Sequence, residues 1–234
     1  VPGLARWLRA ERPKLLVGAA NHSLLATIAA HRLAAEPGVK LALRVSNHLS
    51  GPGLSRWLRA IAVRRSFNRA DAVIAVAEAV AADLKTLHPG LRAPVRVLPN
   101  PVIDADLPRR AAQPPGHPWF ADGGAPVILS VGRLAPQKDI PTLLAAFARL
   151  SSEARLVIVG DGPERARLEA RAAELGIAAR VSFTGALADP FPLMAAARLF
   201  VLSSRWEGLP GALIEAMACG CAVVSTDCPG GSAE

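Results

Sequence analysis

The sequence has few of the features that mark several classes of protein. Its 234 residues include 3 cysteines, 4% aromatic residues and no tyrosine. No apolar run approaches the roughly 18 to 20 uncharged residues that span a bilayer. Charged residues also interrupt the segment from Arg6 to Lys14, where a secretory signal would need an apolar centre. These residues therefore indicate neither a membrane-spanning helix nor a signal peptide.

The three cysteines lie close together in the sequence, at Cys219, Cys221 and Cys228. Their number is odd, their spacing is not that of metal ligands, and no histidine is nearby. A disulfide framework and a metal site are therefore both disfavoured. We expect the cysteines to pack in the core of a protein from a reducing cytosol.

Acidic residues are scarce in the first half of the chain. The net charge is +8, yet residues 1–110 carry 17 Lys and Arg against 7 Asp and Glu, whereas residues 111–234 carry 10 against 12. This asymmetry predicts an anionic partner for the first half, either a phospholipid surface or a phosphate-bearing substrate. Ordinary solvated arginine faces are the alternative. A nucleic-acid-binding module fits poorly, because the basic half has no aromatic strip on which bases could stack.

Apolar runs alternate with helical patterns along both halves of the chain. Strands are expected at 14–20, 39–45, 71–76 and 95–98, and again at 127–131, 155–159, 181–185, 199–202 and 222–226. Runs that are apolar throughout indicate strands covered on both faces. Strands that alternate with helices predict parallel pairing with right-handed crossovers, and therefore an α/β fold.

Prolines interrupt the pattern in the middle of the chain, from Pro99 to Pro118. Proline removes a backbone donor and fixes φ, so this stretch cannot hold regular structure for long. We predict an N-terminal α/β domain at 1–104, an interdomain linker at 105–124 and a C-terminal α/β domain at 125–234.

The most informative stretch runs from Ser203 to Gly231. It reads as a strand end, a glycine and proline loop, a short helix and the next strand. Ligands of parallel α/β sheets bind at the carboxyl ends of strands, which is where this loop lies. Two carboxylates, Glu207 and Glu215, flank the loop with seven residues between them. Such a pair would also suit the acid and base of a glycosidase, although a glycosidase needs no adjoining phosphate site.

A second motif, Gly132-Arg-Leu followed by Gln137-Lys-Asp, comes after the first strand of the second half. Arg133 would fork onto phosphate oxygens and Lys138 would supply a point charge, so the two suit a bound diphosphate. The alternative is that Arg133 and Lys138 are ordinary surface residues at the start of a helix. The loop before the helix at 212–219 can also offer backbone N–H groups to an anion. Gly208 and Leu209 are the expected donors, because Pro210 has no N–H.

These motifs together resemble those of the family 4 retaining nucleotide-sugar glycosyltransferases, the glycosyl transferases group 1, which have the GT-B fold of two Rossmann-like domains. The resemblance rests on the run S-R-W-E-G-L-P-x-x-L-I-E-A-M-A-C-G, on Gly-Arg-Leu with Gln-Lys-Asp, on Gly160-Asp-Gly-Pro and on Val-x-Phe-x-Gly ending at Gly185. It is close over 125–231 and looser over 14–105. It implies that both domains are incomplete here, since the family's first strand and last helices are not in this sequence.

The resemblance implies a bacterial, retaining and metal-independent transferase without a cofactor. It would move a sugar from a nucleoside diphosphate sugar, a UDP-sugar before others, to a glycan or lipid-linked acceptor in cell-surface polysaccharide or lipopolysaccharide synthesis. Asp104-Ala-Asp106 imitates a metal-binding motif of another glycosyltransferase fold, but it lies in the predicted linker. A nucleotide-sugar 2-epimerase of the same fold and a non-catalytic nucleotide-sugar-binding relative are the alternatives.

The resemblance also implies roles for individual residues. Glu207 would contact the donor sugar, Glu215 the ribose hydroxyls, Arg133 and Lys138 the diphosphate, and His48 the neighbourhood of the donor sugar. A lone histidine is as often structural. The predicted catalytic residues are Glu207, Arg133, Lys138 and His48. The predicted donor-binding residues are Gly132, Arg133, Lys138, Gly185, Glu207, Gly208, Leu209, Pro210 and Glu215.

Residues Ser55 to Arg69 interleave five arginines with Trp57 and other apolar residues. A basic amphipathic helix with a tryptophan suits the interface of an anionic membrane. Trp57 packed in the core, with the arginines solvated, is the alternative. We therefore expect a cytoplasmic protein, with peripheral contact at the inner face of the cell membrane as a further expectation.

Overall fold

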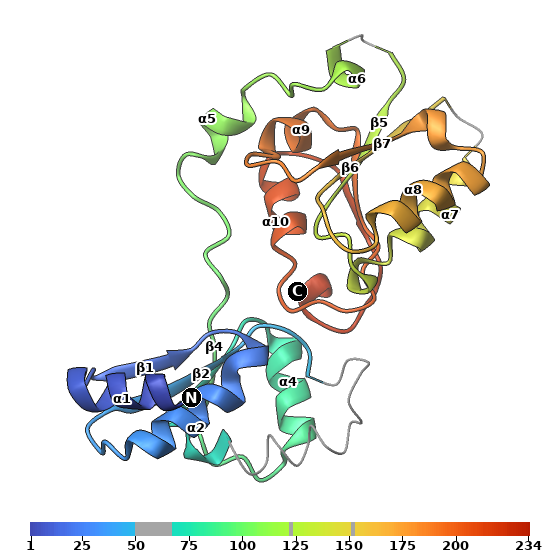
Figure 1. Ribbon diagram of the computed structural model, residues 1–234. Helices are drawn as coiled ribbons and strands as arrows, with labels where there is room; N and C mark the ends of the chain where they lie inside the picture. The colour runs from blue at the N-terminus through green and yellow to red at the C-terminus, as the bar shows by residue number, and fades with distance from the viewer. Residues whose placement is uncertain (50–66, 122–123, 151–152) are drawn as a thin grey trace. The chain divides into compact units, whose positions relative to one another are not determined.

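The structure, a computed structural model, describes residues 1–49, 67–121, 124–150 and 153–234. Its internal contacts divide the chain into two units (Figure 1). The first unit comprises Val1–Asn100, Glu207–Leu209 and Pro229–Glu234, and the second comprises Pro101–Trp206 and Pro210–Cys228. The division at Asn100 falls before the boundary expected at residue 104. Two short segments of the second half, which the sequence assigned wholly to the C-terminal domain, have their contacts in the first unit.

The first unit is built on a parallel sheet in the order β1-β2-β3-β4. Its strands are β1 (Leu15–Gly18), β2 (Lys40–Val45), β3 (Ala72–Ala75) and β4 (Val95–Val97). Its helices are α1 (Pro2–Glu11), α2 (Leu24–Ala34) and α4 (Glu78–Leu87), with short 3-10 turns η1 (Asn21–Ser23), η2 (Phe67–Arg69) and η5 (Gly231–Ala233). Each strand expected in this half is present, so the α/β prediction holds here.

The core of the first unit lies against β2 and β3. Leu41, Leu43 and Val45 of β2 are fully buried, and Val80 and Leu84 of α4 pack in the same cluster. The expectation that β1 is a buried strand is wrong, since Leu15 is 54% and Val17 45% exposed. Among the described residues β1 is packed on one face: Leu16 lies against the core clusters, whereas the alternating side chains of Leu15 and Val17 lie in solvent.

The second unit is built on a parallel sheet in the order β7-β6-β5-β8-β9. Its strands are β5 (Val127–Val131), β6 (Arg155–Val159), β7 (Val181–Gly185), β8 (Leu199–Leu202) and β9 (Val223–Ser225). Its helices are α5 (Leu107–Ala111), α6 (Pro118–Ala121), α7 (Ile140–Ala148), α8 (Arg165–Glu174), α9 (Phe191–Ala196) and α10 (Gly211–Ala218), with 3-10 turns η3 (Pro136–Lys138) and η4 (Ala178–Arg180).

The two faces of this sheet are covered by different helices (Figure 1). Leu156 and Ile158 of β6 pack in the cluster formed with α7 and α8. Val157 and Val159 point to the opposite face and pack in the cluster formed with α9 and α10. Because β6 is covered on both faces, its sequence is continuously apolar from Leu156 to Val159 rather than alternating.

The predicted linker forms part of the second unit rather than a bare connection. It contains α5 and α6, and Leu107 of α5 is 3% exposed in the same core as Leu193 and Met194 of α9. Both helices are short, as the sequence suggested, with 5 residues in α5 and 4 in α6. Leu107 anchors α5 in the core of the sheet domain.

Two further expectations concern the cysteines and the membrane. Burial raises the pKa of the thiols of Cys219 and Cys221, so both are held in the unreactive protonated form. Cys221 and Cys228 are buried, in agreement with a packing role. Among the described residues, no helix combines the length and apolar character that crossing a bilayer requires.

Candidate functional site

The candidate site in the second unit lies at the carboxyl ends of β5 and β8. The chain proceeds outward from β5 through β6 and β7 on one side, and through β8 and β9 on the other. Ligands of open parallel sheets bind where the strand order reverses in this way. Two segments meet there: the Lys138 loop, residues 132–139, which follows β5, and the Ser203 loop, residues 203–206, which follows β8.

The Lys138 loop carries Gly132, Arg133 and Lys138, three of the predicted site residues. The amide of Gly132 donates to the carbonyl of Val159 at 2.9 Å, which fixes the start of the loop on β6. A Cβ at position 132 would lie 3.1 Å from Cε of Lys138, so the lysine side chain passes over this glycine. The loop closes with η3 and with Asp139 in the left-handed conformation, φ 45°, at the start of α7.

The Gly160-Asp-Gly-Pro turn after β6 supports the backbone of the Lys138 loop. A Cβ at Gly160 would overlap the carbonyl oxygen of Gly132, and a Cβ at Gly162 would overlap the backbone of Leu134. The amide of Leu134 also donates to the carbonyl of Asp161 at 2.9 Å. From the sequence this turn was expected to shape the floor of the cleft, and the close backbone approach accounts for both of its glycines.

The Ser203 loop is joined to the Lys138 loop by hydrogen bonds. Ser203, which is 5% exposed, donates from Oγ to the carbonyl of Lys138 at 2.7 Å. The amide of Arg205 donates to the carbonyl of Gln137 at 2.8 Å, and Nε2 of Gln137 donates to the carbonyl of Trp206 at 2.9 Å. The position of Lys138 is therefore set by the Ser203 loop as much as by its own strand.

An ion pair closes the same junction. The guanidinium of Arg205 donates to the carboxylate of Asp139 at 3.1 Å. Burial alone would raise the pKa of Asp139, but hydrogen bonds from Arg205 and Thr142 outweigh it and hold that pKa below its ordinary value. Asp139 is therefore ionised near neutral pH and keeps Arg205 beside the Lys138 loop.

Glu215 and Gly185 lie on other elements of the second unit. Glu215 is on α10, which begins at Gly211 immediately after Pro210, and burial raises the pKa of its carboxyl group. The positive charge of Arg110 acts in the opposite direction. Gly185 ends β7 with φ 79°, a conformation that favours glycine.

The predicted residues Glu207, Gly208 and Leu209 have their contacts in the first unit. Glu207 is 5% exposed, and its amide donates to the carbonyl of Pro229 at 2.9 Å. Gly208 accepts from the amide of Gly231 at 2.7 Å. A Cβ at Gly208 would overlap the carbonyl oxygen of Ser46, so glycine is needed there for close packing.

His48 belongs to a polar cluster in the first unit. Its Nδ1 lies 3.4 Å from Oδ2 of Asp83, and the amide of Leu49 donates to the same carboxylate oxygen at 2.7 Å. Asn21 joins this cluster, since its Oδ1 accepts from the amide of Ser46 at 2.9 Å. Asp83 therefore orients the ring of His48.

The structure thus groups the predicted residues by unit. The second unit brings Gly132, Arg133 and Lys138 to the switch point, and it also holds Gly185, Pro210 and Glu215. The first unit holds His48, Glu207, Gly208 and Leu209. Ser203, Arg205 and Asp83, which support the predicted residues, were not predicted from the sequence. A signal existed for Asp83, because it occupies a buried position of α4, where a polar residue requires a partner.

The amphipathic helix predicted at Ser55–Arg69 lies almost entirely outside the described residues. Of that segment the structure describes only η2, in which Phe67 is 2% exposed. The membrane contact therefore stays a prediction.

Comparison with known proteins assigns almost the whole chain to two family descriptions. The family "Glycosyl transferases group 1" matches residues 118–234, and "Glycosyl transferase 4-like domain" matches residues 1–101. The chain is 33% identical over 232 residues to a 2-deoxystreptamine N-acetyl-D-glucosaminyltransferase of Streptomyces fradiae, covering 91% of this chain and 54% of that protein. The lipopolysaccharide core biosynthesis glycosyltransferase LpsE of Rhizobium meliloti is 43% identical over 102 residues, 44% of this chain and 30% of that protein.

Among solved structures, the Anabaena protein HepE in complex with UDP and glucose superposes with a TM-score of 0.85 at 26% identity. The match covers 100% of this chain and 64% of HepE. The chain spans about half or less of the length of these curated relatives. With both family descriptions matched and two parallel α/β sheets in place, the chain belongs to the family 4 glycosyltransferases of GT-B fold.

Proposed function

We propose that the whole protein transfers a sugar from a nucleoside diphosphate sugar to a glycan or lipid-linked acceptor. The observation that carries the proposal is the junction of the Lys138 and Ser203 loops at the switch point of the second sheet. That junction places Arg133 and Lys138 where a parallel sheet binds its ligand. HepE, the similar Anabaena protein, has UDP and glucose bound, which supports a UDP-sugar as the donor.

The chemistry proposed for this junction is electrostatic. The diphosphate gains negative charge as the bond to the sugar breaks, and cations fixed in advance at that charge lower the barrier. Arg133 and Lys138 would supply those cations, Glu207 would hold the sugar hydroxyls and Glu215 the ribose. We propose retention of the anomeric configuration, with the acceptor hydroxyl attacking from the face that the diphosphate leaves and a donor phosphate oxygen taking its proton.

We further propose that no metal ion or cofactor takes part. Arg133 and Lys138 offer the positive charge that a metal would otherwise bring to the diphosphate. The two aspartates of the metal-like Asp104-Ala-Asp106 sequence are engaged by arginines instead. Asp104 pairs with Arg110 at 3.2 Å, and Asp106 pairs with Arg109.

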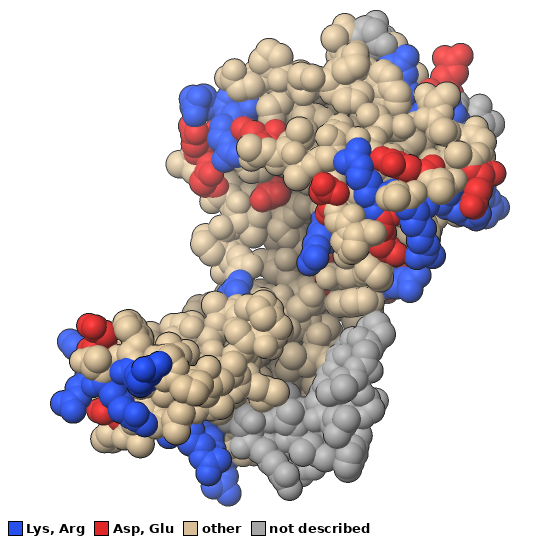
Figure 2. All heavy atoms as spheres, viewed as in Figure 1, with Lys and Arg blue, Asp and Glu red and all other residues tan. Residues whose placement is uncertain are grey.

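The acceptor is proposed to be anionic or to reside at an anionic surface, because the first unit is basic. Figure 2 shows Lys and Arg with few acidic neighbours on the visible face of the first unit, whereas both signs are interspersed over the second. Binding of the Ser55–Arg69 segment to anionic vesicles would support a place at the inner face of the membrane. Equal sedimentation of the full-length protein with neutral and anionic vesicles would contradict it.

The test of the donor assignment uses the full-length protein and a panel of UDP-, GDP- and ADP-sugars. Lys138→Ala and Glu207→Ala should each lower turnover about 100-fold or more, the first because a cation at the diphosphate is lost and the second because the sugar is no longer held in position. Lys85→Ala, which removes an exposed lysine of α4, is the control and should keep the wild-type rate. Wild-type turnover in Lys138→Ala or Glu207→Ala would refute the assignment.

The same material tests the finer parts of the proposal. An NMR spectrum of the product should show the anomeric configuration of the donor, and an inverted product would contradict retention. Turnover should persist in excess EDTA if no metal is needed. Incubation without acceptor should yield no epimerised nucleotide sugar, and an epimer would favour the 2-epimerase alternative.

A further inference from the structure

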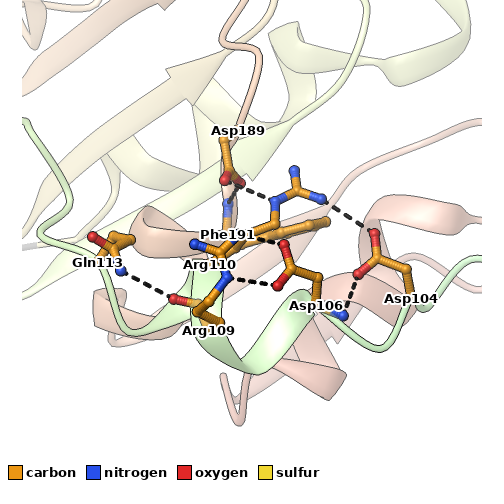
Figure 3. Close-up of polar contacts among 7 residues, drawn as sticks. All are labelled: Asp104, Asp106, Arg109, Arg110, Gln113, Asp189 and Phe191. Carbon is orange, nitrogen blue, oxygen red and sulfur yellow. Dashed lines mark hydrogen bonds and ion pairs between the residues drawn. The ribbon is translucent and has the colours of Figure 1, made fainter.

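Arg110 on α5 makes contacts that reach beyond its own helix. Its Nε donates to Oδ2 of Asp189 at 2.9 Å, and a terminal nitrogen donates to Oδ2 of Asp104 at 3.2 Å (Figure 3). Its guanidinium carbon lies 4.3 Å from the centroid of the Phe191 ring. The side chain is 27% exposed, so solvent screens these interactions only in part. One arginine therefore joins the start of the 101–121 segment to the loop and first residue of α9.

The neighbouring Arg109 makes a different kind of contact. It pairs with Asp106 three residues earlier, at 2.5 Å, and its side chain is 70% exposed. That pair joins α5 only to Asp106, the residue immediately before the helix, as Figure 3 shows. Exposed pairs at this spacing contribute little to stability. The chain thus supplies a matched control for Arg110 at the adjacent position.

The helix that carries Arg110 shares a hydrophobic core with the helix that carries Glu215. Leu107 of α5, Phe191 of α9 and Leu213 and Ala216 of α10 are buried in one cluster. Glu215 lies between Leu213 and Ala216 on α10. Phe191, which Arg110 contacts, therefore packs in the same cluster as α10, the helix that carries Glu215.

The surroundings of Glu215 hold few other charges. The elements α9, β8 and β9, which pack against α10, contain no titratable side chain, whereas α5, which shares its core cluster, carries Arg109 and Arg110. Among the described residues Arg110 is the charge that acts on Glu215, and Cys219, Cys221 and Asp189 are the other titratable groups of this region. Burial raises the pKa of Glu215, and the positive charge of Arg110 partly offsets that rise.

We propose that Arg110 is a positioning residue of the donor site: it docks the 101–121 segment on α9, which packs in the same cluster as α10, the helix that carries Glu215. The inference rests on the proposed function, in which Glu215 accepts hydrogen bonds from the ribose. An ionised Glu215 is the better acceptor, so loss of the Arg110 charge would weaken nucleotide binding without any contact between Arg110 and the nucleotide.

The docking part of the proposal is tested without ligand. In the full-length protein, Arg110→Met keeps the apolar stem and removes the charge, and Asp189→Asn removes its partner. The urea midpoints of these variants and of the double variant form a double-mutant cycle. We expect each single change to lower the midpoint and the double change to add little further. Strictly additive losses would refute docking through this pair.

The donor part is tested by binding of UDP and UDP-glucose at neutral pH, measured by titration calorimetry on the same variants. Arg110→Met should weaken binding about tenfold, Arg110→Lys less, and Arg109→Met by less than twofold. Equal affinities for Arg110→Met and Arg109→Met would refute this part. Absence of binding by the wild type would refute the proposed function as well, while the ligand-free cycle still decides the docking.

A pH profile separates positioning from a general loss of structure. UDP-glucose binding should weaken as the pH falls through the raised pKa of Glu215, because the protonated carboxyl no longer accepts two hydrogen bonds. Arg110→Met removes the opposing charge, so the fall should begin at a higher pH than in the wild type. Glu215→Gln should bind weakly with no such dependence. An unshifted profile in Arg110→Met would overturn the link to Glu215.

Discussion

Two glycines after β6 have no room for a side chain, because a Cβ at either position would overlap the backbone of the Lys138 loop. Gly160 has φ 137° and a Cβ there would overlap the carbonyl oxygen of Gly132. Gly162 has no such φ, yet its Cβ would overlap the backbone of Leu134. Since backbone cannot rotate away as a side chain can, we predict that Gly160→Ala and Gly162→Ala each lower the free energy of unfolding by about 3 kcal/mol or more. Urea denaturation of the full-length protein measures this.

Substitutions at two other glycines distinguish the effect of crowding from that of backbone strain. Gly176 has φ 68° with nothing near its Cβ position, so Gly176→Ala should cost about 1 kcal/mol from strain alone. Gly38→Ala has neither problem and should leave the midpoint unchanged or slightly higher. An unchanged urea midpoint for Gly162→Ala, as expected for Gly38→Ala, would contradict the close approach of the Gly162 and Leu134 backbones.

Single residues also show what the sequence could and could not predict. Gly132, Arg133 and Lys138 follow an apolar strand directly, so their position at the carboxyl end of β5 was predictable. Ser203 was visible as the first residue after β8, but its bond to the carbonyl of Lys138 depends on a neighbour 65 positions away. No local pattern encodes such a partner. The docking of Arg110 on Phe191 was hidden for the same reason.

The junction of the Lys138 and Ser203 loops belongs to the scale of elements, because it joins the ends of β5 and β8. We predict that Ser203→Ala, which removes the hydrogen bond to the carbonyl of Lys138, lowers the free energy of unfolding by about 1 kcal/mol. Because Lys138 then loses part of its support, the KM for the donor should rise several-fold with a smaller change in kcat. Steady-state kinetics of the full-length enzyme measure both.

Ser225→Ala is the matched control for this change. Ser225 lies on β9 and its Oγ donates to the carbonyl of its neighbour Thr226 at 3.0 Å, away from the Lys138 loop. We expect the Ser225→Ala variant to have the wild-type KM and kcat. Equal KM values for the two variants would show that the bond from Ser203 does not position the loop.

The elements themselves were predictable to different degrees. The strands at 127–131, 155–159, 181–185 and 199–202 begin and end where expected, because covered parallel strands are short apolar runs bounded by glycine, polar residues or proline. α5 was missed because a helix of about one turn that contains proline has no periodicity to read. The burial of β1 was misjudged, since an apolar run does not reveal whether one face of a strand or both faces are covered.

The whole molecule has a basic first half and a second half with nearly balanced charge. That charge pattern and the two α/β units were predictable from composition and alternation. The sequence did not predict that Glu207–Leu209 and Pro229–Glu234 have their contacts in the first unit. That assignment depends on contacts between segments far apart in the sequence. The predicted site residues are therefore divided between units in a way that chain order does not show.

This division leads to a prediction about where the donor acts. A ligand that binds the folded state stabilises it by about 2.7 kcal/mol at 100 times Kd, and it slows hydrogen exchange most where it contacts the protein. UDP should therefore protect amides of the Lys138 loop and of α10, and leave those of α1 and α2 unchanged. Hydrogen exchange of the full-length protein with and without UDP, read by mass spectrometry, tests this. Protection confined to α1 and α2 would place the nucleotide on the basic first unit and contradict the donor assignment of the second.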